Sequence, residues 1–438
     1  MRIIRVKDME KFQPPRGTRD FLPDEMAARR ALCEKIRKVF EAYGYGEVCT
    51  PAFEDFALLE KKSGPQIEDE IYAFTDKGGR KLGLRFDPTV PICRIVASNP
   101  ALQKPVKFYY ITNMWRYDNP GAGRWREFWQ AGVELIGPAG PEADAEMLAL
   151  VSDCIRAAGI KDFTIRVNSR VFVEGFLEDA KVPKALWPEM MRSLDKTLKL
   201  GVEGVKEELR RKGIDKEYIE AFMKYARSSV PKGPAWSDGG AKNVKGKSNI
   251  DDIVRIQKLA GKMGAGRIEI DLSIVRGIDY YTGFVFETYV KGFEGMGSVA
   301  GGGRYDGLIG LYSGRDTPAT GFGMGIDRLM EIVGKGGTPP APKVFVIQVS
   351  EKTRGHALEI TQMLRRSGVS ADTDLMGRDL RKQMEYAGKR GVPFALIVGP
   401  REAESGRYTL RDMKTGKEEL LTPEGVLRKL AGRQGPRP

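Results

Sequence analysis

Three arginines close to one loop are the first sign of chemistry in this sequence. The segment 108–137 consists of two β-like runs joined by a loop containing Gly and Pro, and it holds Arg116, Arg124 and Arg126. A guanidinium group can donate two parallel hydrogen bonds to phosphate oxygens, so three of them on one hairpin suit an oligophosphate. Solvated surface arginines would explain this segment equally well by itself.

The return run of the same hairpin has a polar face. Gln130, Gly132 and Glu134 alternate with apolar residues, and side chains two positions apart in a strand share a face. Two polar side chains with a glycine between them predict the floor of a pocket.

A second segment with chemical groups lies at 268–290. It places Arg276, Asp279, Tyr280 and Tyr281 around a turn between apolar strands. Tyrosine pairs in such places are more often core residues with a hydroxyl at the edge than ligands of a substrate.

Two glycine-rich runs follow, at 298–310 and 321–330. The second reads G-x-G-x-G before an arginine, which is not the spacing of a dinucleotide-binding fold. Glycines two apart along a strand leave one face bare, so we expect a planar base to lie against the backbone there.

The composition argues against several other kinds of site. His356 is the one histidine, and it lies in an amphipathic helical pattern, which disfavours a Ser-His-Asp hydrolase. The four cysteines form no C-x-x-C pair and predict neither a zinc site nor a disulfide framework, so we expect the reducing cytoplasm. No apolar run approaches the ~18 residues of a membrane span, and the charged start is unlike a signal peptide.

The elements that must position these groups fall into a core and a basic tail. The 438 residues have a net charge of +13. Residues 341–438 contribute 19 Lys and Arg against 12 Asp and Glu, a net +7, and they follow a Gly- and Pro-rich linker at 334–342. A basic surface favours a polyanionic partner, most simply nucleic acid.

The tail, 343–438, predicts a separate α/β domain. Apolar strands alternate with helices at about 351–367 and 378–389, which favours a parallel βαβαβ layer. A hairpin around 414–416 follows, and Thr422 with Pro423 opens a last helix.

The blocks 1–170 and 262–333 predict one core built on an antiparallel sheet, because their strand-like runs alternate in polarity and their turns are short. Between them, 171–261 is helical and rich in Lys and Glu, and we interpret it as an inserted helical subdomain. Its Gly246-Lys247-Ser248 resembles the end of a phosphate-binding P-loop, but the glycine spacing is wrong and no apolar strand precedes it.

Five separated segments carry a family resemblance. RGTRDFLP at 16–23, the arginine hairpin and GFGMGIDRL at 321–329 resemble the three motifs of class II aminoacyl-tRNA synthetases. RGIDYYTGFVFE at 276–287 and GGGRYDGL at 301–308 resemble the two signatures of the histidyl-tRNA synthetase family. The resemblance extends from about residue 13 to the C-terminus. It implies a class II α+β catalytic core with a helical insertion, and a C-terminal α/β anticodon-binding domain.

The resemblance also implies a role for each arginine. Arg116 matches the arginine that holds the ATP α-phosphate, and Arg276 matches one that contacts both this phosphate and the amino-acid carboxylate; both are therefore candidate catalytic residues. Arg328 matches an arginine that lies over the adenine, opposite Phe128. The implied ATP-binding set is Arg116, Arg124, Arg126, Phe128 and Arg328.

For the amino acid, the resemblance implies a pocket for histidine. Asp87 and Thr89, in the run LRFDPT, match positions that hold the ammonium group. The implied substrate-binding set is completed by Gln130, Glu134, Tyr280, Tyr281 and Tyr305.

The activity that the resemblance implies is a histidine–tRNA ligase, which activates histidine with ATP and transfers it to the 3′-terminal adenosine of histidine tRNA. Mg²⁺ accompanying the ATP, a homodimer and a cytoplasmic location are implied as well, while the Mg²⁺ ligands stay open. The alternative is a non-catalytic, histidine-binding regulatory paralogue of ATP phosphoribosyltransferase, a kind of protein that typically lacks the anticodon-binding domain. A pure RNA-binding or sensor module of the same fold is a further alternative.

Overall fold

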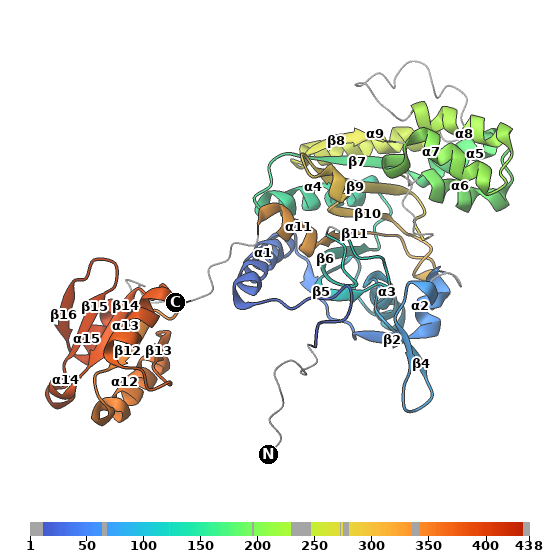
Figure 1. Cartoon of the computed structure of the whole chain (residues 1–438). Helices are drawn as coiled ribbons and strands as arrows, with labels where there is room; N and C mark the ends of the chain where they lie inside the picture. Colours follow the sequence, from blue (N-terminus) through green and yellow to red (C-terminus); the bar gives the residue numbers. More distant parts are fainter. Residues whose placement is uncertain are drawn as a thin grey trace. The chain divides into compact units, whose positions relative to one another are not determined.

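The computed structural model describes residues 12–63, 68–121, 123–194, 197–228, 247–271, 273–274, 280–334 and 341–431. The chain forms two compact units that divide between Gly337 and Thr338, inside the predicted linker. Each unit has its own sheet and apolar core (Figure 1). No helix in the described part of the chain has the length and apolar character that crossing a membrane requires.

An eight-stranded sheet forms the centre of unit 1, in the order β1-β5-β6-β11-β10-β9-β7-β8. The five inner pairs, from β5–β6 to β9–β7, are antiparallel, as predicted, whereas β1–β5 and β7–β8 at the two edges are parallel. β11 lies between β6 and β10, so the second core block completes the sheet begun by the first. The strands are β1 Gly46–Glu47, β5 Val106–Trp115, β6 Glu127–Ile136, β7 Phe163–Ser169, β8 Arg267–Ile270, β9 Phe284–Val290, β10 Ala300–Arg304 and β11 Ala319–Gly325.

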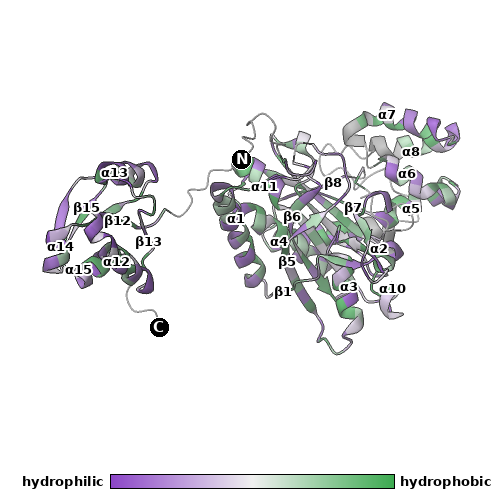
Figure 2. Cartoon of the chain, turned by 60° about the horizontal axis from the view of Figure 1, so that its bottom comes forward, coloured by the Kyte–Doolittle hydropathy of each residue, from purple (hydrophilic) through white to green (hydrophobic). Residues whose placement is uncertain are grey.

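Four helices pack on one face of this sheet: α1 Pro23–Ala42, α4 Pro141–Ala157, α9 Lys247–Lys262 and α11 Ile326–Val333. α1 and α4 both have proline at their start and acidic residues in the first turn, which suits the positive end of the helix dipole. Figure 2 shows hydrophilic and hydrophobic residues mixed along α1, as expected of a helix with one buried face. Although α9 falls in the predicted insertion, its Ile253, Ile256 and Ala260 belong to this core.

The opposite face of the sheet is covered at its margin. Helices α3 Thr89–Ser98 and α10 Gly310–Ser313 pack together with Tyr110 and Met114 of β5 in a smaller apolar cluster. Beyond them lies a three-stranded sheet. It consists of β2 Phe53–Asp55, β4 Lys81–Leu84 and β3 Ala73–Thr75, with α2 Phe56–Ser63 against it.

The predicted insertion contains a bundle of helices with its own apolar core. Its elements are α5 Arg170–Asp179, a 3₁₀ turn Lys184–Leu186, α6 Trp187–Leu194, α7 Thr197–Arg211 and α8 Lys216–Ser228. Among the described residues, α5 contacts the sheet at β7 and β9 and also meets α9, and Ile270 of β8 packs against the core of the bundle. The bundle therefore lies at one end of unit 1 (Figure 1). Gly246 of the P-loop-like tripeptide lies outside the described residues.

Unit 2 has the predicted α/β fold, with strand order β13-β12-β14-β15-β16. The first three of these strands are parallel, and the hairpin β15–β16 is antiparallel. Helices α12 and α15 pack on one face of the sheet and α13 on the other. The elements are β12 Val344–Gln348, a 3₁₀ turn Glu351–Thr353, α12 Arg354–Arg366, β13 Ala371–Thr373, α13 Leu380–Lys389, β14 Phe394–Val398, α14 Pro400–Ser405, β15 Tyr408–Asp412, β16 Glu418–Leu421 and α15 Pro423–Ala431.

Two predicted details of unit 2 are confirmed. The Thr422 hydroxyl accepts the Gly425 N–H at 3.3 Å, as an N-cap before Pro423 should. His356 is a residue of α12, and its Nε2 lies 2.5 Å from the Tyr408 hydroxyl. Its contact is therefore with its own unit's sheet.

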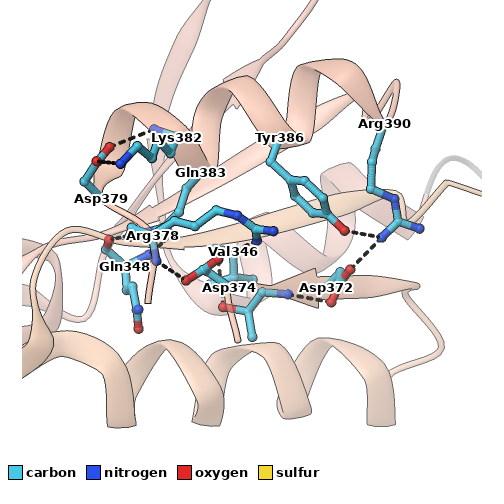
Figure 3. A network of polar contacts seen from close by, with 11 residues as sticks. Val346, Gln348, Asp372, Asp374, Arg378, Asp379, Lys382, Gln383, Tyr386 and Arg390 are labelled. Carbon is cyan, nitrogen blue, oxygen red and sulfur yellow. Dashed lines mark hydrogen bonds and ion pairs between the residues drawn. The ribbon is translucent and has the colours of Figure 1, made fainter. Parts of the chain in front are cut away.

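A polar network joins α13 to the strands beneath it (Figure 3). The buried Gln383 side chain accepts the Gln348 N–H at 3.1 Å and donates to the Gln348 carbonyl at 3.0 Å and the Arg378 carbonyl at 2.7 Å. This carboxamide therefore pairs with the last residue of β12, beyond the point where β13 ends. Arg378 and Arg390 approach the Tyr386 ring, with guanidinium carbons 4.4 and 5.6 Å from its centroid.

Candidate active site

A cavity of about 510 Å³ opens beside the central strands of unit 1. Its lining comes from β5, β6, β10 and β11, from the hairpin loop and from the start of α11. The predicted polar face of β6 lines this cavity with Gln130 and Glu134, while Ala131 and Val133 lie in the core on the other side. The cavity thus brings together the arginine hairpin at 108–137 and the glycine-rich segments between 298 and 330, which are distant in the sequence.

The Glu134 carboxylate lies at the centre of a buried group of polar residues. It accepts a hydrogen bond from the Tyr305 hydroxyl at Oε2 and one from the Thr89 hydroxyl at Oε1, at 2.7 Å. The Thr89 N–H in turn donates to Asp87 Oδ1 at 2.6 Å. Four residues that the resemblance placed in the substrate pocket are therefore joined by one chain of hydrogen bonds, and all four are less than a tenth exposed.

Burial keeps the tyrosine hydroxyls of this site protonated. It raises the pKa of Tyr305 well above the ordinary value, and the negative charge of Glu134 raises it further. Burial also raises the pKa of Tyr110 and of Tyr280. These groups consequently remain hydrogen-bond donors at any pH near neutrality.

Tyr280 and Tyr281 both line the cavity. Their ring centroids are 4.5 Å apart, and Tyr280 meets the Tyr305 ring edge-on at 5.7 Å. The Tyr281 ring also packs in a small apolar cluster with Ile274 and Val285. Tyr281 therefore fits both interpretations of the sequence: its ring packs in an apolar cluster, and the residue also lines the predicted substrate pocket. Arg276 and Asp279 lie outside the described residues.

Cationic side chains line another part of the cavity. Arg116 donates from Nε to the Phe86 carbonyl at 3.0 Å, and its guanidinium carbon lies 5.2 Å from the Phe128 ring centroid. Arg328 donates to the Ser298 carbonyl. Arg124, which is largely exposed, lies 3.6 Å from an oxygen of Asp118. All three arginines and Phe128 belong to the cavity lining.

Arg126 is the member of the predicted ATP-binding set that lies elsewhere. Its guanidinium covers the Tyr117 ring at 4.1 Å, and its Nε donates to the Asp118 carbonyl at 3.2 Å. The N–H of Arg126 donates to the Gly17 carbonyl at 2.7 Å, which ties the hairpin to the first motif. The structure therefore gives Arg126 a scaffolding contact, and its binding to ATP stays a prediction.

Several residues that support the site were missed in the sequence. Asp327 accepts from Arg19 at 3.0 Å and from Arg29 at 3.4 Å with one oxygen, and from the Trp129 N–H at 2.7 Å with the other. This carboxylate fixes the backbone beside Arg328 to both α1 and β6. Arg19 lies within RGTRDFLP, so the resemblance covered it, but no pattern in the sequence pairs it with a residue 308 positions away.

Arg85 is another supporting residue without a sequence signal. Its buried guanidinium donates to the carbonyls of Thr50 at 2.5 Å and Pro51 at 3.1 Å, and its Nε donates to the Asn113 carbonyl at 3.1 Å. These contacts fix the strand end that leads directly into Asp87.

The described residues contain no group of three or more His, Cys, Asp or Glu side chains arranged to hold a metal ion. Glu70 and Glu287 do line the cavity. Mg²⁺ is commonly bound through one or two carboxylates together with the phosphates of a nucleotide. The carboxylates present fit an ion that arrives with ATP better than one held by the protein alone.

Comparison with known proteins places the chain in a family. Residues 17–329 match the model of the family described as histidyl-tRNA synthetase. The histidine–tRNA ligase of Thermococcus kodakarensis is 40% identical over 436 residues, which cover 96% of this chain and 99% of that protein. The chain belongs to the histidyl-tRNA synthetase family. The histidine–tRNA ligase of Methanocaldococcus jannaschii, at 38% identity, is a further full-length relative.

Solved structures agree with membership of the histidyl-tRNA synthetase family. The histidyl-tRNA synthetase of a Nostoc species superimposes with a TM-score of 0.75 at 26% identity, and the match covers 97% of this chain and all of that one. Residues 343–433 match the model described as anticodon binding domain. The predicted family, the α+β core and the C-terminal α/β domain are thereby confirmed.

Proposed function

We propose that the protein is a histidine–tRNA ligase that joins histidine to tRNA in two steps, through histidyl-adenylate. The observation that carries this function is the single cavity that holds both the Glu134–Tyr305–Thr89 cluster and the arginines Arg116 and Arg328. One end of the cavity is suited to a small polar molecule and the other to phosphates. Full-length membership of the histidyl-tRNA synthetase family supports the same reading.

In the proposed first step, the carboxylate of histidine attacks the α-phosphorus of ATP and pyrophosphate leaves. The nucleophile is the substrate itself, so no protein base is needed. Arg116 and, by the resemblance, Arg276 hold the negative charge that develops on the phosphate oxygens, which is the form of stabilisation that fixed cations supply best. Mg²⁺ arriving with ATP would neutralise part of the phosphate charge, and the Glu70 and Glu287 carboxylates of the cavity lining would help to hold it.

For the selection of histidine, we propose that Glu134 and the tyrosine hydroxyls face the imidazole. A neutral imidazole carries one N–H donor and one acceptor nitrogen. Glu134 supplies acceptor oxygens, and the hydroxyl of Tyr281 supplies a donor, with Gln130 and Tyr280 closing the pocket. Asp87 and Thr89 are proposed to hold the ammonium group, since Asp87 offers a buried carboxylate beside the cluster.

Arg328 and Phe128 are proposed to enclose the adenine, and Arg124 to contact the phosphates. In the second step the histidyl group passes to the 3′-terminal adenosine of histidine tRNA. The partner RNA is proposed to bind unit 2, in agreement with the anticodon-binding match and the net +7 of residues 341–438. We further propose a homodimer and a cytoplasmic location, both of which rest on the resemblance of the motifs.

One assay tests the function against its alternatives. Histidine-dependent exchange of pyrophosphate into ATP, followed by charging of histidine tRNA, is expected of the wild-type protein. Binding of histidine without either reaction would point to the regulatory paralogue, and binding of tRNA alone to an RNA-binding module. The presence of unit 2 already disfavours the first of these alternatives.

A further inference from the structure

A row of glycines crosses the sheet at the floor of the cavity. Gly323 of β11 is paired with Gly301 of β10 on one side and with Gly132 of β6 on the other. Gly132 is in turn opposite Tyr110 of β5. Directly opposed residues in antiparallel strands face the same side of a sheet. Three neighbouring strands therefore present no side chain here, next to a buried tyrosine.

Side chains from the neighbouring positions lie over this bare row. The Gln130 carboxamide occupies the space above Gly323: a Cβ built on Gly323 would overlap its Nε2 and lie 2.7 Å from its Cδ. Gln130 Nε2 donates to the Tyr110 hydroxyl at 3.3 Å, and this hydroxyl would be 3.4 Å from the same Cβ. The Tyr110 hydroxyl likewise fills the space above Gly132.

The three glycines on this face of β11 differ in what they meet. At Gly321 a Cβ would overlap the Glu134 carboxylate and also the Val133 carbonyl, so the backbone itself would have to move. At Gly325 a Cβ would meet only the Arg328 side chain, at 3.5 Å or more, which is ordinary contact. At Gly323 the close contacts are all with the end of the Gln130 side chain. A methyl group there would move a pocket residue while leaving the strand in place.

We propose that Gly323 is a positioning residue for histidine recognition. Because glycine has no side chain, the Gln130 carboxamide can occupy the space directly above the backbone of Gly323. The inference rests on the proposed function, in which Gln130 closes the histidine pocket. The sequence suggested instead that the alternating glycines leave a bare surface for a planar base. Since Gln130 already covers Gly323, the glycine at this position acts on the amino acid and not on the nucleotide.

The test is a double-mutant cycle with Gly323→Ala, Gln130→Ala and the double variant, measured by pyrophosphate exchange in the full-length protein. Gly323→Ala is expected to raise KM for histidine on the order of tenfold or more, since a shift of about 1 Å in a positioned group is enough for such a loss. KM for ATP should stay within about twofold. In the Gln130→Ala background, Gly323→Ala should not raise KM for histidine any further, because the side chain that it would displace has been removed.

Gly261→Ala is the matched control. This glycine lies in α9, a Cβ there would meet nothing within 4 Å, and the variant should behave as wild type. If Gly323→Ala unfolds the protein, the double variant still tests the proposal, because removal of the Gln130 side chain relieves the overlap and should restore folding. A double variant that folds and matches Gln130→Ala supports the proposal.

Three outcomes would overturn it: penalties that multiply in the double variant, a Gly323→Ala effect on ATP as large as that on histidine, or wild-type kinetics for Gly323→Ala. The proposed function fails separately, through loss of histidine-dependent exchange in the wild-type protein itself. If the wild type is active and Gln130→Ala leaves KM for histidine unchanged, the ligase function stands while the role of Gln130, and with it that of Gly323, is wrong.

Discussion

Glu134 is a carboxylate enclosed by groups that donate to it. The Tyr305 and Thr89 hydroxyls each occupy one of its oxygens, and the residue is 2% exposed. A buried acceptor that loses its charge or its second oxygen leaves neighbouring donors unpaired, which costs about 1–3 kcal/mol per group. The residue is therefore the most sensitive single position for substrate selection that the described part of the site offers.

Glu134→Gln is accordingly expected to raise KM for histidine on the order of 10- to 100-fold. Tyr281→Phe should act in the same direction with a smaller effect, because it removes one hydroxyl and keeps the ring. The measurement is pyrophosphate exchange with histidine and ATP titrated separately. A change confined to the ATP constant would contradict the pocket assignment.

The thiols give a prediction that is independent of the function. Cys33, Cys93 and Cys154 are buried and Cys49 is exposed. Burial raises the pKa of Cys33 to about 11 and that of Cys154 well above its ordinary value. Because the thiolate is the reactive form, a raised pKa reduces reactivity at neutral pH, and the reaction rate of Cys33 should keep rising with pH until the pH passes about 11.

At pH 8 a thiol reagent should therefore modify Cys49 alone in the native protein. All four cysteines should react after unfolding in denaturant, and peptide mapping identifies the modified residue. Rapid modification of Cys154 in the native protein would show that the α4 core opens far more readily than its packing implies.

Residue patterns predicted the site only in part. The two-residue period of β6 placed Gln130 and Glu134 on one face without any structure, since alternation is a local property of a strand. Tyr110 was not found, because the same alternation fits a core tyrosine. The Arg19–Asp327 contact joins positions 308 apart, and a single sequence contains no signal for pairing at such a distance.

The existence and order of helices and strands were easier to predict from the sequence than which elements pack against one another. In unit 2 the strand order, the helices α12, α13 and α15, the hairpin and the final N-cap follow the sequence pattern, because each step is a short local connection. The short helix α14 was not predicted. In unit 1 the parallel pairing of β1 and β8 at the sheet edges was missed, since two- and four-residue strands carry little periodicity. The packing of α9 on α4 was missed because an amphipathic face does not identify what covers it.

The packing of α13 on β12 is predicted to depend on the side chain of Gln383. Gln383→Leu would leave the N–H and carbonyl of Gln348 and the carbonyl of Arg378 without the partner described above, which should destabilise unit 2 by about 1–3 kcal/mol. Lys382→Ala, one position earlier and exposed, is the control and should change stability by less than about 0.5 kcal/mol.

Chemical denaturation can attribute this loss to one unit. All five tryptophans, Trp115, Trp125, Trp129, Trp187 and Trp236, precede residue 338, so their fluorescence reports on unit 1 alone, whereas far-UV circular dichroism reports on both units. Gln383→Leu should shift the transition seen by dichroism and leave the tryptophan transition in place. A shift of the tryptophan transition alone would contradict the assignment of Gln383 to unit 2 stability.

At the scale of the whole molecule, the two units predict a separation of the two reaction steps. The cavity lies within unit 1, and unit 2 has its own sheet and core. A chain ending at Pro340 should keep histidine-dependent pyrophosphate exchange and charge tRNA poorly. Its affinity for tRNA should also depend less on salt, because fewer phosphates are contacted and fewer counterions released.

The oligomeric state of this shortened chain has to be measured alongside, by sedimentation, because loss of a dimer could mimic loss of tRNA binding. The informative comparison is between dimers of equal concentration. If the shortened dimer charged tRNA as well as the full chain, with the same salt slope, unit 2 would not be the anticodon reader.

The position of β11 between β6 and β10 also affects how the chain folds during its synthesis on the ribosome. Gly132 and Gly323, which are paired in the finished sheet, are roughly 190 residues apart, and contacts so distant in sequence form slowly because a long loop must close first. A ribosome adding about 5–20 residues per second needs roughly 10–40 s to travel that distance. Throughout this interval the hairpin β5–β6 has left the ribosome with one edge of β6 unpaired, and such an edge is a template for pairing with other chains. Nascent chains stalled before residue 319 should therefore aggregate more readily, and recruit more chaperone, than chains stalled after β11 has emerged.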